Sequence, residues 1–313
     1  MKYYLIGPYP PPLGGVSVYV YRYVRILNAR GQEAEIIDLS KKSKLGRLFY
    51  LLKWIFDPRE AIFHLNVFDF YAMIALTLRP FKGKIIFQDH SAYFLESIGG
   101  MKRIILKFFL KKVDECVLVG EHLRAYYQQY GYKLPDKTHI RHAFLPPPLE
   151  DESRIWRTYD AETLRFVESH KPLIIANAFQ ITFYRGVDLY GLDMCIALVA
   201  ALKKEHPKIG LLFALAAVGN EKYFDAMNRR IYELGIQENF HFMTGQKELW
   251  PLFRKADLMV RPTCTDGYGI SVAEALYFKC PAVASNVCQR AEGTVLFESR
   301  NQKDFLDKVR ELL

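Results

Sequence analysis

Short apolar segments alternate with helical patterns throughout the sequence, and this alternation limits the chain to few folds. "KYYLIG" near the N-terminus has the length and apolar content of a buried strand. A helical pattern follows from about Ser17 and places Val20, Val24 and Leu27 on one face. "GQEAEIIDLS" closes a first β-α-β unit, and further strands of this kind are "AIFHLNV", "GKIIFQDH" and "ECVLVG". Such alternation predicts a parallel sheet covered by helices on both faces.

The segment "FLPPPLEDES" interrupts this pattern with prolines and charges, as is typical of a domain boundary. A second strand series follows, made of "PLIIANAF", "IGLLFALAAVG", "FHFMTG", "DLMV" and "PAVAS". The 313 residues are also more than one ordinary core needs. The sequence therefore predicts an α/β protein of two Rossmann-like, doubly wound domains, residues 1–150 and 151–313, that face each other across a cleft. Loops at the carboxyl ends of the strands would line that cleft.

Composition limits the cellular compartment and the kinds of partner that are expected for this protein. A formal charge of +9 favours phosphates, nucleic acid or an acidic membrane face. Five cysteines without metal spacing are expected to be reduced, buried thiols of a cytosolic protein. No apolar run reaches the length of a signal peptide or a membrane span, so we expect neither. The final "KDFLDKVRELL" is expected to be the last helix of the second domain rather than a helix that crosses back to the first, which would couple the domains loosely.

The stretch "RPTCTDGYGISVAEALYFKCPAVASNV" concentrates acids and glycines after the strand "DLMV". Gly267 and Gly269 permit a tight turn beside Asp266 and close approach of backbone to a ligand. A helix beginning near Ser271 would offer free N–H groups and a partial positive charge to an anion. Alternatively, Ser271 and Glu274 form a capping box and satisfy each other's backbone donors, in which case Glu274 needs no ligand. Both interpretations stay open on these residues alone.

This stretch resembles the donor-sugar signature of retaining glycosyltransferases of family 4, which have the GT-B fold. The family pattern is Glu-x7-Glu around Gly-Phe-Gly, then an Ala-rich helix, Gly-x-Pro and a strand ending in Ala-Ser. Here Asp266-Gly267-Tyr268-Gly269 precedes Glu274-Ala275-Leu276, and Cys280-Pro281 leads to Ala284-Ser285. The resemblance implies that Asp266 contacts the transferred sugar and Glu274 the ribose hydroxyls, although Asp is one methylene shorter than the usual Glu. The implied donor-binding residues here are Asp266, Gly267, Tyr268, Gly269, Ile270, Ser271 and Glu274.

The resemblance extends upstream through "YRGVDLYGLDMCIALVAALKKEHP". Arg185 stands where a lysine normally holds the diphosphate, and arginine can bind phosphate bidentately. A solvated loop arginine is the alternative. Gln180 is the nearest match to a second cation of the family and is neutral, so the sequence matches only half of the usual cationic clamp. Gly219 and Gly245 match loop glycines of the family or are ordinary turn glycines. Asn177, at the end of "IIAN", is a further donor-binding candidate.

In the N-terminal half, Gly14 and Gly15 precede a helix and are similar to the family's first loop, which approaches the diphosphate or the acceptor. His90 ends the strand "IIFQDH" and is similar to the histidine that faces the transferred sugar. Asp89 would orient its imidazole or cap the following turn. Weaker candidates end the preceding strand: His64 and Asn66.

The resemblance implies a retaining glycosyltransferase that moves a sugar from a nucleotide-sugar donor to a glycan or lipid-linked acceptor in bacterial cell-surface polysaccharide synthesis. No metal cofactor is expected, which agrees with the absence of an Asp-x-Asp motif. The implied catalytic residues are His90, Asp266 and Arg185. Arg185, the helix start near Ser271 and the amides of Gly14 and Gly15 would stabilise the departing diphosphate.

Two basic segments also carry many apolar residues: 41–56, "KKSKLGRLFYLLKWIF", and 101–112, "MKRIILKFFLKK". Each basic residue near an anionic bilayer contributes about 1 kcal/mol, so either helix candidate suffices for reversible attachment. We therefore expect an anionic membrane surface as a further partner and a cytoplasmic protein that is peripheral at the inner face of the plasma membrane. The alternative is that the apolar face packs on the sheet while the lysines are only solvated.

Two other functions fit the sequence poorly, and a third remains open. A dinucleotide-dependent oxidoreductase should show G-x-G-x-x-G after the first strand, and "GPYPPPLGGVS" lacks that spacing. Nucleic-acid binding is suggested by charge alone, without a recognition motif. A non-catalytic glycosyltransferase-like subunit that binds a glycan or protein partner remains the alternative, because Gln180 and Asp266 depart from the family pattern.

Overall fold

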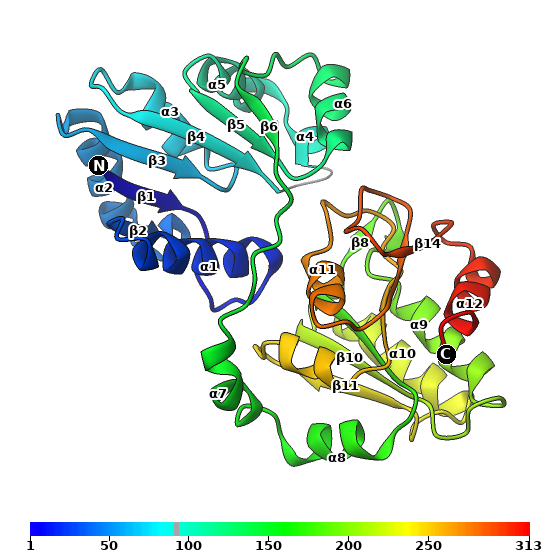
Figure 1. Ribbon diagram of the computed structural model, residues 1–313. Helices are drawn as coiled ribbons and strands as arrows, with labels where there is room; N and C mark the ends of the chain where they lie inside the picture. Colours follow the sequence, from blue (N-terminus) through cyan, green and yellow to red (C-terminus); the bar gives the residue numbers. More distant parts are fainter. Residues whose placement is uncertain (91–93) are drawn as a thin grey trace. The chain divides into compact units, whose positions relative to one another are not determined.

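The computed structural model describes residues 1–90 and 94–313 and divides into two compact units, Met1–Leu145 and Pro146–Leu313. Each unit contains a parallel six-stranded sheet with helices packed on it (Figure 1). The predicted fold class, α/β with two Rossmann-like domains, is confirmed. The boundary between the units lies after Leu145, five residues before the predicted boundary at residue 150.

The N-terminal unit has the strand order β2-β1-β3-β4-β5-β6, with every pair parallel. Its strands are β1 (Lys2–Ile6), β2 (Ala34–Ile37), β3 (Ala61–Leu65), β4 (Lys84–Asp89), β5 (Glu115–Leu118) and β6 (Thr138–Ile140). Its helices are α1 (Gly15–Ala29), η1 (Leu39–Lys41), α2 (Lys44–Phe56), α3 (Phe70–Leu78), α4 (Phe94–Ser97), α5 (Gly100–Leu110) and α6 (Glu121–Gln129). The strand order reverses between β1 and β3, where ligands of such sheets usually bind.

Helices cover both faces of this sheet, as the alternation predicts. In Figure 1, α1 lies below the sheet, whereas α3 and α5 lie above it. Strand β3 is buried along its whole length, which explains why its sequence is almost continuously apolar. Trp54 of α2 packs edge-on against Phe63 of β3, and Phe109 of α5 packs edge-on against Phe87 of β4. These aromatic contacts fix the two helices on the same sheet.

The C-terminal unit has the strand order β11-β10-β7-β12-β13-β14. Its strands are β7 (Leu173–Gln180), β10 (Gly210–Ala217), β11 (Phe240–Thr244), β12 (Leu258–Arg261), β13 (Ala282–Ser285) and β14 (Val295–Phe297), with a hairpin of β8 (Phe183–Tyr184) and β9 (Val187–Asp188). Its helices are η2 (Leu149–Asp151), α7 (Glu152–Trp156), α8 (Ala161–Ser169), α9 (Leu192–Leu202), α10 (Glu221–Glu233), η3 (Trp250–Arg254), α11 (Ile270–Tyr277) and α12 (Gln302–Arg310). In order of appearance the six strands are arranged 3-2-1-4-5-6, the doubly wound order of dinucleotide-binding domains, with its switch point between β7 and β12.

A core lies on each face of the second sheet. Helix α9 is almost entirely buried on one face, where Leu198, Leu211 and Phe305 belong to one cluster. Trp250, Val272 and Ala275 belong to the cluster on the other face, so α11 is anchored through its inner side. Helix α12 packs against α9 and β14 of its own unit. The rigid packing of α11 is what holds the loop before it in one position.

Two further observations concern the N-terminus and membrane spans. Helix α1 begins at Gly15, two residues before the predicted start, with Gly14 as its N-cap. Ser17 Oγ accepts a hydrogen bond from Gly14 N at 2.9 Å and donates one to Pro12 O at 2.7 Å, so the serine ties the preceding loop to the helix from inside the first turn. Among the helices formed by the described residues, none is long and apolar enough to cross a bilayer.

Candidate functional site

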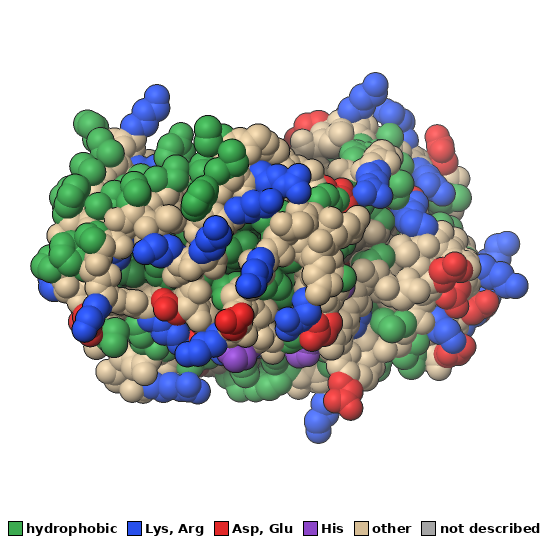
Figure 2. Space-filling model, turned by 90° about the horizontal axis from the view of Figure 1, so that it is seen from above, with side chains coloured by type: hydrophobic (Ala, Val, Ile, Leu, Met, Phe, Trp, Pro, Cys, Tyr) green, Lys and Arg blue, Asp and Glu red, His purple; other side chains and the backbone are tan. Residues whose placement is uncertain are grey.

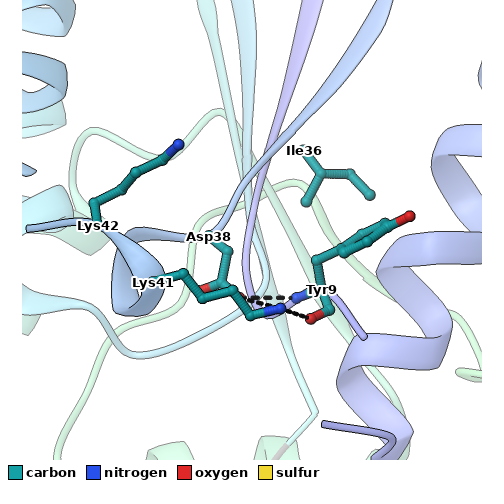
Figure 3. A pocket seen from close by; sticks show the side chains of 5 residues that line it. All are labelled: Tyr9, Ile36, Asp38, Lys41 and Lys42. Carbon is teal, nitrogen blue, oxygen red and sulfur yellow. Dashed lines mark hydrogen bonds and ion pairs between the residues drawn. The ribbon is translucent and has the colours of Figure 1, made fainter. Parts of the chain in front are cut away.

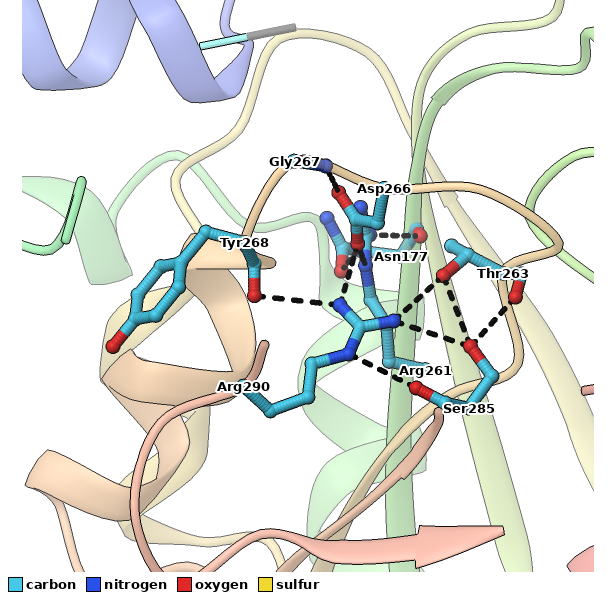
Figure 4. Close-up of polar contacts among 8 residues, drawn as sticks. All are labelled: Asn177, Arg261, Thr263, Asp266, Gly267, Tyr268, Ser285 and Arg290. Carbon is cyan, nitrogen blue, oxygen red and sulfur yellow. Dashed lines mark hydrogen bonds and ion pairs between the residues drawn. The ribbon is translucent and has the colours of Figure 1, made fainter. Parts of the chain in front are cut away.

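A buried ionic cluster lies where β7 and β12 diverge in the C-terminal unit (Figure 4). Asp266 is in the loop after β12, and its Oδ2 accepts hydrogen bonds from Arg261 Nε at 2.9 Å and from Arg290 Nη1 at 2.8 Å. Its Oδ1 accepts the N–H of Gly267 at 2.9 Å. The three charged side chains are only 13%, 10% and 2% exposed, respectively. The switch point of the sheet therefore holds a carboxylate between two guanidinium groups.

The two arginines connect this carboxylate to the neighbouring strands. Arg261 ends β12, and its Nη1 donates to the backbone and side-chain oxygens of Asn177 on β7, both at 3.2 Å. Arg290 Nη2 donates to Thr263 Oγ1 at 2.9 Å and to Ser285 Oγ at 3.1 Å, and Arg290 Nε donates to Ser285 O at 3.1 Å. Each arginine thus has several acceptors, which offset the cost of burying its charge.

These contacts determine the pKa of Asp266 and the net charge of the cluster. Burial alone would raise the pKa of Asp266, but the charges and hydrogen bonds of Arg261 and Arg290 outweigh it and hold the pKa well below its usual range. One carboxylate against two guanidinium groups leaves one net positive charge. A carboxylate offers about four acceptor positions. Three of these are occupied by described residues, so Oδ1 retains one for a hydroxyl donor.

Gly269 is the residue that lets the loop and the cluster coexist. It is the N-cap of α11 and has φ 80°, a left-handed conformation that favours glycine. A Cβ at this position would lie 2.5 Å from Arg290 Nη1 and 3.3 Å from Asp266 Oδ2. Helix α11 therefore begins directly beside the cluster. Val272 N of its first turn donates to Gly269 O at 3.0 Å, and the N–H groups of Ile270 and Ser271 lie at the helix start. Net positive charge and helix N–H groups together suit an anionic ligand.

The capping-box interpretation of Ser271 and Glu274 is wrong. Because α11 begins at Ile270 after Gly269, Ser271 is the second helical residue and no side chain caps the helix. Ser271 and Glu274 are 8% and 6% exposed. Glu274 is the fifth residue of the helix, too late for the first turn. Its buried carboxyl therefore has no capping role to explain it.

Arg185 lies at the tip of the hairpin β8–β9. Arg185 and Gly186 form a two-residue turn with φ 49° and 78°, which is typical of hairpins that require two left-handed residues. Its exposed guanidinium lies over the ring of Tyr184, 5.1 Å from the centroid. An arginine in a conformation that favours glycine or asparagine is unusual. The structure brings it to a turn just after the carboxyl end of β7, and its contact with a ligand stays a prediction.

Gln180 and the two loop glycines have backbone explanations. Gln180 is the last residue of β7 and pairs with Ala217 of β10. A Cβ on Gly219 would lie 2.8 Å from Ile181 O and 3.1 Å from Gln180 Cβ, so close strand packing requires a glycine there. Gly245 has φ 94°, and an added Cβ would have no neighbour within 4 Å, so its backbone conformation alone explains the glycine. These three residues are near strand ends, and their contact with a ligand stays a prediction.

In the N-terminal unit, His90 follows β4 and is half-buried. Its Nε2 lies 3.2 Å from Asn66 Oδ1, and its ring packs edge-on against Tyr19 at 4.8 Å. Burial, with a smaller effect of His64, lowers the pKa of His90 to about 3. The ring is therefore neutral near pH 7 and is held by Asn66, while Asp89 accepts a hydrogen bond from Tyr127 at 2.9 Å.

His64 is a core histidine rather than a surface candidate. It is 0% exposed, and its Nε2 lies 3.1 Å from Gln88 Oε1, which also accepts the hydroxyl of Tyr19 at 2.9 Å. Burial lowers the pKa of His64 to about 4. Asn66 donates to His64 O at 3.0 Å, so it links the core histidine to His90.

A small cavity of about 260 Å³ lies beside the loops that follow β1 and β2 (Figure 3). Asp38 accepts the N–H of Tyr9 at 3.1 Å and forms an ion pair with Lys41 at 3.7 Å, while Lys41 also donates to Tyr9 O. Ile36 and Lys42 complete the lining. This volume is slightly below the usual range of ligand pockets. The cavity was not predicted from the sequence, because its walls come from two separate loops.

Sequence reasoning also missed the two arginines of the ionic cluster. Arg261 is the last residue of an apolar strand, a position that is compatible with a charged side chain pointing to either face. Arg290 lies 24 residues beyond Asp266 in a loop without a recognisable motif. The only signal was Gly269, whose requirement for glycine reflects the space taken by Arg290.

Comparisons with known proteins agree on the fold of both units, and a family model matches most of the second unit. Residues 169–313 match the family model described as glycosyl transferases group 1. Lipopolysaccharide glucosyltransferase WaaG of Escherichia coli K12 is 30% identical over 132 residues, which cover 39% of this chain and about a third, 34%, of the relative. The crystal structure of Anabaena HepE in complex with UDP and glucose has a TM-score of 0.70 at 13% identity and covers 99% of this chain and 89% of that one. Sucrose-phosphate synthase from Thermosynechococcus elongatus has a TM-score of 0.66 at 15% identity, with the same coverage of 99% and 89%.

Proposed function

We propose that the protein is a retaining glycosyltransferase with a nucleotide-sugar donor, because residues 169–313 match the family model of the glycosyl transferases of group 1. The acceptor is a glycan or a lipid-linked sugar of bacterial cell-surface polysaccharide synthesis. The similarity to a lipopolysaccharide glucosyltransferase supports this class of acceptor. Since solved structures of HepE contain UDP, UDP with glucose, and UDP-glucose, UDP-glucose is the first donor to test.

One observation carries the proposal: the loop 266–269 joins a net positive cluster to the start of α11 at the switch point of the second sheet. A nucleotide sugar combines a diphosphate with many hydroxyls. The helix start and the net charge suit the diphosphate. The remaining acceptor position on Asp266 Oδ1 suits a sugar hydroxyl, and the carboxyl of Glu274 suits the ribose.

The reaction breaks the bond between the anomeric carbon and the phosphate oxygen and forms a bond from the same carbon to the acceptor oxygen. In the mechanism we propose, the acceptor attacks from the face that the phosphate leaves, and its proton passes to a phosphate oxygen. Negative charge then grows on the departing diphosphate. Charge stabilisation of this kind is usually the largest catalytic effect. Arg185, the cluster around Asp266 and the α11 start provide it in this proposal.

Each remaining candidate has a role in the same proposal. His90, whose ring is neutral and held by Asn66, forms one hydrogen bond with the transferred sugar. The amides of Gly14 and Gly15 approach the diphosphate or the acceptor. Fixed guanidinium groups take the role that a metal ion has in other transferases, so we expect full activity in the presence of a chelator. Activity that depends on added Mg²⁺ or Mn²⁺ would contradict this part.

A thermal-shift panel of UDP-, GDP- and ADP-sugars tests donor binding. A ligand at a hundred times its dissociation constant stabilises a protein by about 2.7 kcal/mol, which is readily measured. Radiolabelled donor then tests catalysis, because release of labelled sugar to water or to an acceptor requires an active enzyme. Absence of binding by every nucleotide sugar would contradict the proposal.

A non-catalytic subunit is the second candidate. Two observations favour it. Gln180 stands where the family has a cation, and Asp266 already accepts hydrogen bonds from two arginines. This candidate predicts a thermal shift with glycans but no hydrolysis or transfer of any nucleotide sugar. The two assays together therefore distinguish the candidates.

A further inference from the structure

Helix α2 exposes a continuous apolar stripe. Its exposed apolar residues recur every three or four positions, so they lie on one side of the helix. They are between 44% and 80% exposed and comprise Leu45, Leu48, Phe49, Leu52 and Phe56. Trp54, on the opposite side, is 1% exposed and packs on the sheet. The helix is therefore apolar on the side that faces the core and also on the side that faces solvent.

Helices α3 and α5 have the same property. Their exposed stripes have a spacing of three and four residues and comprise Tyr71, Ile74 and Leu78 on α3 and Met101, Ile104 and Phe108 on α5. Their inner sides are buried through Met73 and Phe109. Helix α3 packs against both α2 and α5, so the three stripes adjoin in one surface, the α2–α3–α5 face. Figure 2 shows hydrophobic side chains gathered on the left of the view, with Lys and Arg among them.

The sheet does not account for this surface, because each helix already packs its other side against the core. Monomeric soluble proteins rarely expose contiguous apolar patches of more than a few hundred Å². A helix that is apolar all round is normally buried or in contact with lipid. The α2–α3–α5 face thus requires a second apolar environment.

The charge of the segments that form this face indicates which apolar environment it contacts. Segments 41–56 and 101–112 contain ten basic residues and no acidic one, and 70–81 also lacks acids. The basic residues are Lys41, Lys42, Lys44, Arg47, Lys53, Lys102, Arg103, Lys107, Lys111 and Lys112. Lys107, Lys111 and Lys112 are exposed, and no carboxylate within residues 1–90 or 94–313 forms an ion pair with them. Apart from the ion pair of Lys41 with Asp38, these segments are one-sided in sign as well as apolar.

We propose that the α2–α3–α5 face binds the surface of a bilayer that contains anionic lipids. The apolar stripes enter the boundary between head groups and acyl chains, and the long lysine side chains reach the lipid phosphates. A symmetric contact with a second copy is disfavoured, since it would set the basic residues of this face against the same residues of the other copy. Lysine is also depleted in protein interfaces.

This inference is independent of the proposed function. None of its residues belongs to the candidate donor site, and it concerns the N-terminal unit alone. It selects the first interpretation of the two basic segments and adds α3, whose exposed stripe was not predicted from the sequence.

Flotation of the full-length protein with phosphatidylcholine vesicles, with and without phosphatidylglycerol, tests the proposal. We expect binding only to the anionic vesicles and weaker binding at high salt. Lys107→Gln/Lys111→Gln/Lys112→Gln should weaken it on the order of a hundredfold, since each basic residue near the surface contributes about a factor of five. Leu48→Gln/Phe49→Gln/Phe108→Gln should abolish it while circular dichroism stays unchanged.

Matched controls lie in the C-terminal unit. Lys204→Gln/Lys208→Gln/Lys222→Gln removes three exposed charges, and Tyr232→Gln removes an aromatic residue that is 74% exposed. Both should bind vesicles like the unmodified protein. Failure to float with anionic vesicles, or equal loss in the controls, would overturn the proposal. So would a dimer in lipid-free sedimentation that Leu48→Gln/Phe49→Gln/Phe108→Gln dissociates, because the face would then be a self-association surface. The change in melting temperature that a nucleotide sugar produces, measured without lipid, reports on the donor site separately.

Discussion

Gly269 leaves the space that the guanidinium of Arg290 occupies, since a Cβ on Gly269 would lie 2.5 Å from Arg290 Nη1. The two residues are far apart in sequence, yet the conformation of one depends on the position of the other. Arg290 in turn holds Asp266 and accepts no alternative position without leaving the buried oxygens of Thr263 and Ser285. The glycine loop and the ionic cluster are therefore one structural unit.

Gly269→Ala should uncouple that unit. A left-handed residue other than glycine costs about 1–2 kcal/mol, and the clash with Arg290 adds to this cost. We expect a lower melting temperature and loss of the thermal shift with the nucleotide sugar. Gly293→Ala is the matched control, because its φ is also positive, 87°, but the nearest atom is 3.9 Å away. It should lose only the stability that backbone strain costs and still bind donor. Equal loss of binding in both variants would show that backbone strain alone is responsible.

Asp266→Asn should strongly destabilise the C-terminal unit. It leaves two buried guanidinium groups without a counter-charge, and breaking a buried ion pair in this way costs about 3–5 kcal/mol. Asp193→Asn removes a partner of Arg300 from a pair whose side chains are 23% and 34% exposed, and should cost less than about 1 kcal/mol. Urea denaturation of the two variants measures the difference. Similar values for both would mean that water or a neighbouring group compensates for the lost carboxylate of Asp266.

Stability of the N-terminal unit should fall as the pH is lowered from neutrality. Burial lowers the pKa of His64 to about 4, below its ordinary value of 6.5. The unfolded chain therefore binds a proton that the folded chain excludes, and stability that is fully present above pH 6.5 is lost as the pH falls towards 4. The loss reaches about 3 kcal/mol. Hydrogen exchange of β3 amides across this range checks the slope. His64→Gln should reduce it and leave the part that is due to His90, whose pKa is lowered to about 3.

The sequence was sufficient for the long elements of the fold. Strands such as β7 and β10 are continuous apolar runs between turn residues, so both their type and their order were predictable. Strands β6 and β14 have three residues each and the strands of the hairpin have two, which is too short for a periodic pattern. Helix starts were displaced because Gly14 and Gly269 act as N-caps in place of the neighbouring serines.

The candidate site was only half visible in the sequence. Its loop lies within one contiguous stretch, whereas its charges come from the end of β12 and from the loop after β13. Gln180 suggested an incomplete cationic clamp, yet two buried arginines lie at the same switch point. Three-dimensional neighbours that lack a shared motif cannot be paired by spacing alone.

Arg185→Asn should weaken donor binding or turnover without loss of stability. A hydrogen bond to a charged group contributes about 1.5–3 kcal/mol, which corresponds to roughly ten- to 150-fold. Asparagine tolerates the left-handed conformation that Arg185 adopts, so the variant removes charge without adding strain. Arg185→Lys keeps the charge and loses the bidentate geometry, and should be intermediate. If kcat/KM of Arg185→Asn equals that of the unmodified enzyme, Arg185 is a solvated turn residue.

Glu274→Gln should remove most of the thermal shift that a nucleotide sugar produces. Gln preserves the size of the side chain and the helix propensity of α11, and because Gly269 is the N-cap the variant leaves the helix start intact. The ligand-free melting temperature should therefore change little, whereas a carboxylate that accepts two ribose hydroxyls loses a charged acceptor. Val272→Ala, on the same helix but in the core and outside the candidate site, controls for packing and should keep the donor shift. A full donor shift in Glu274→Gln would assign that side chain to the core of the unit and would leave Asp266 and the α11 start as the donor contacts.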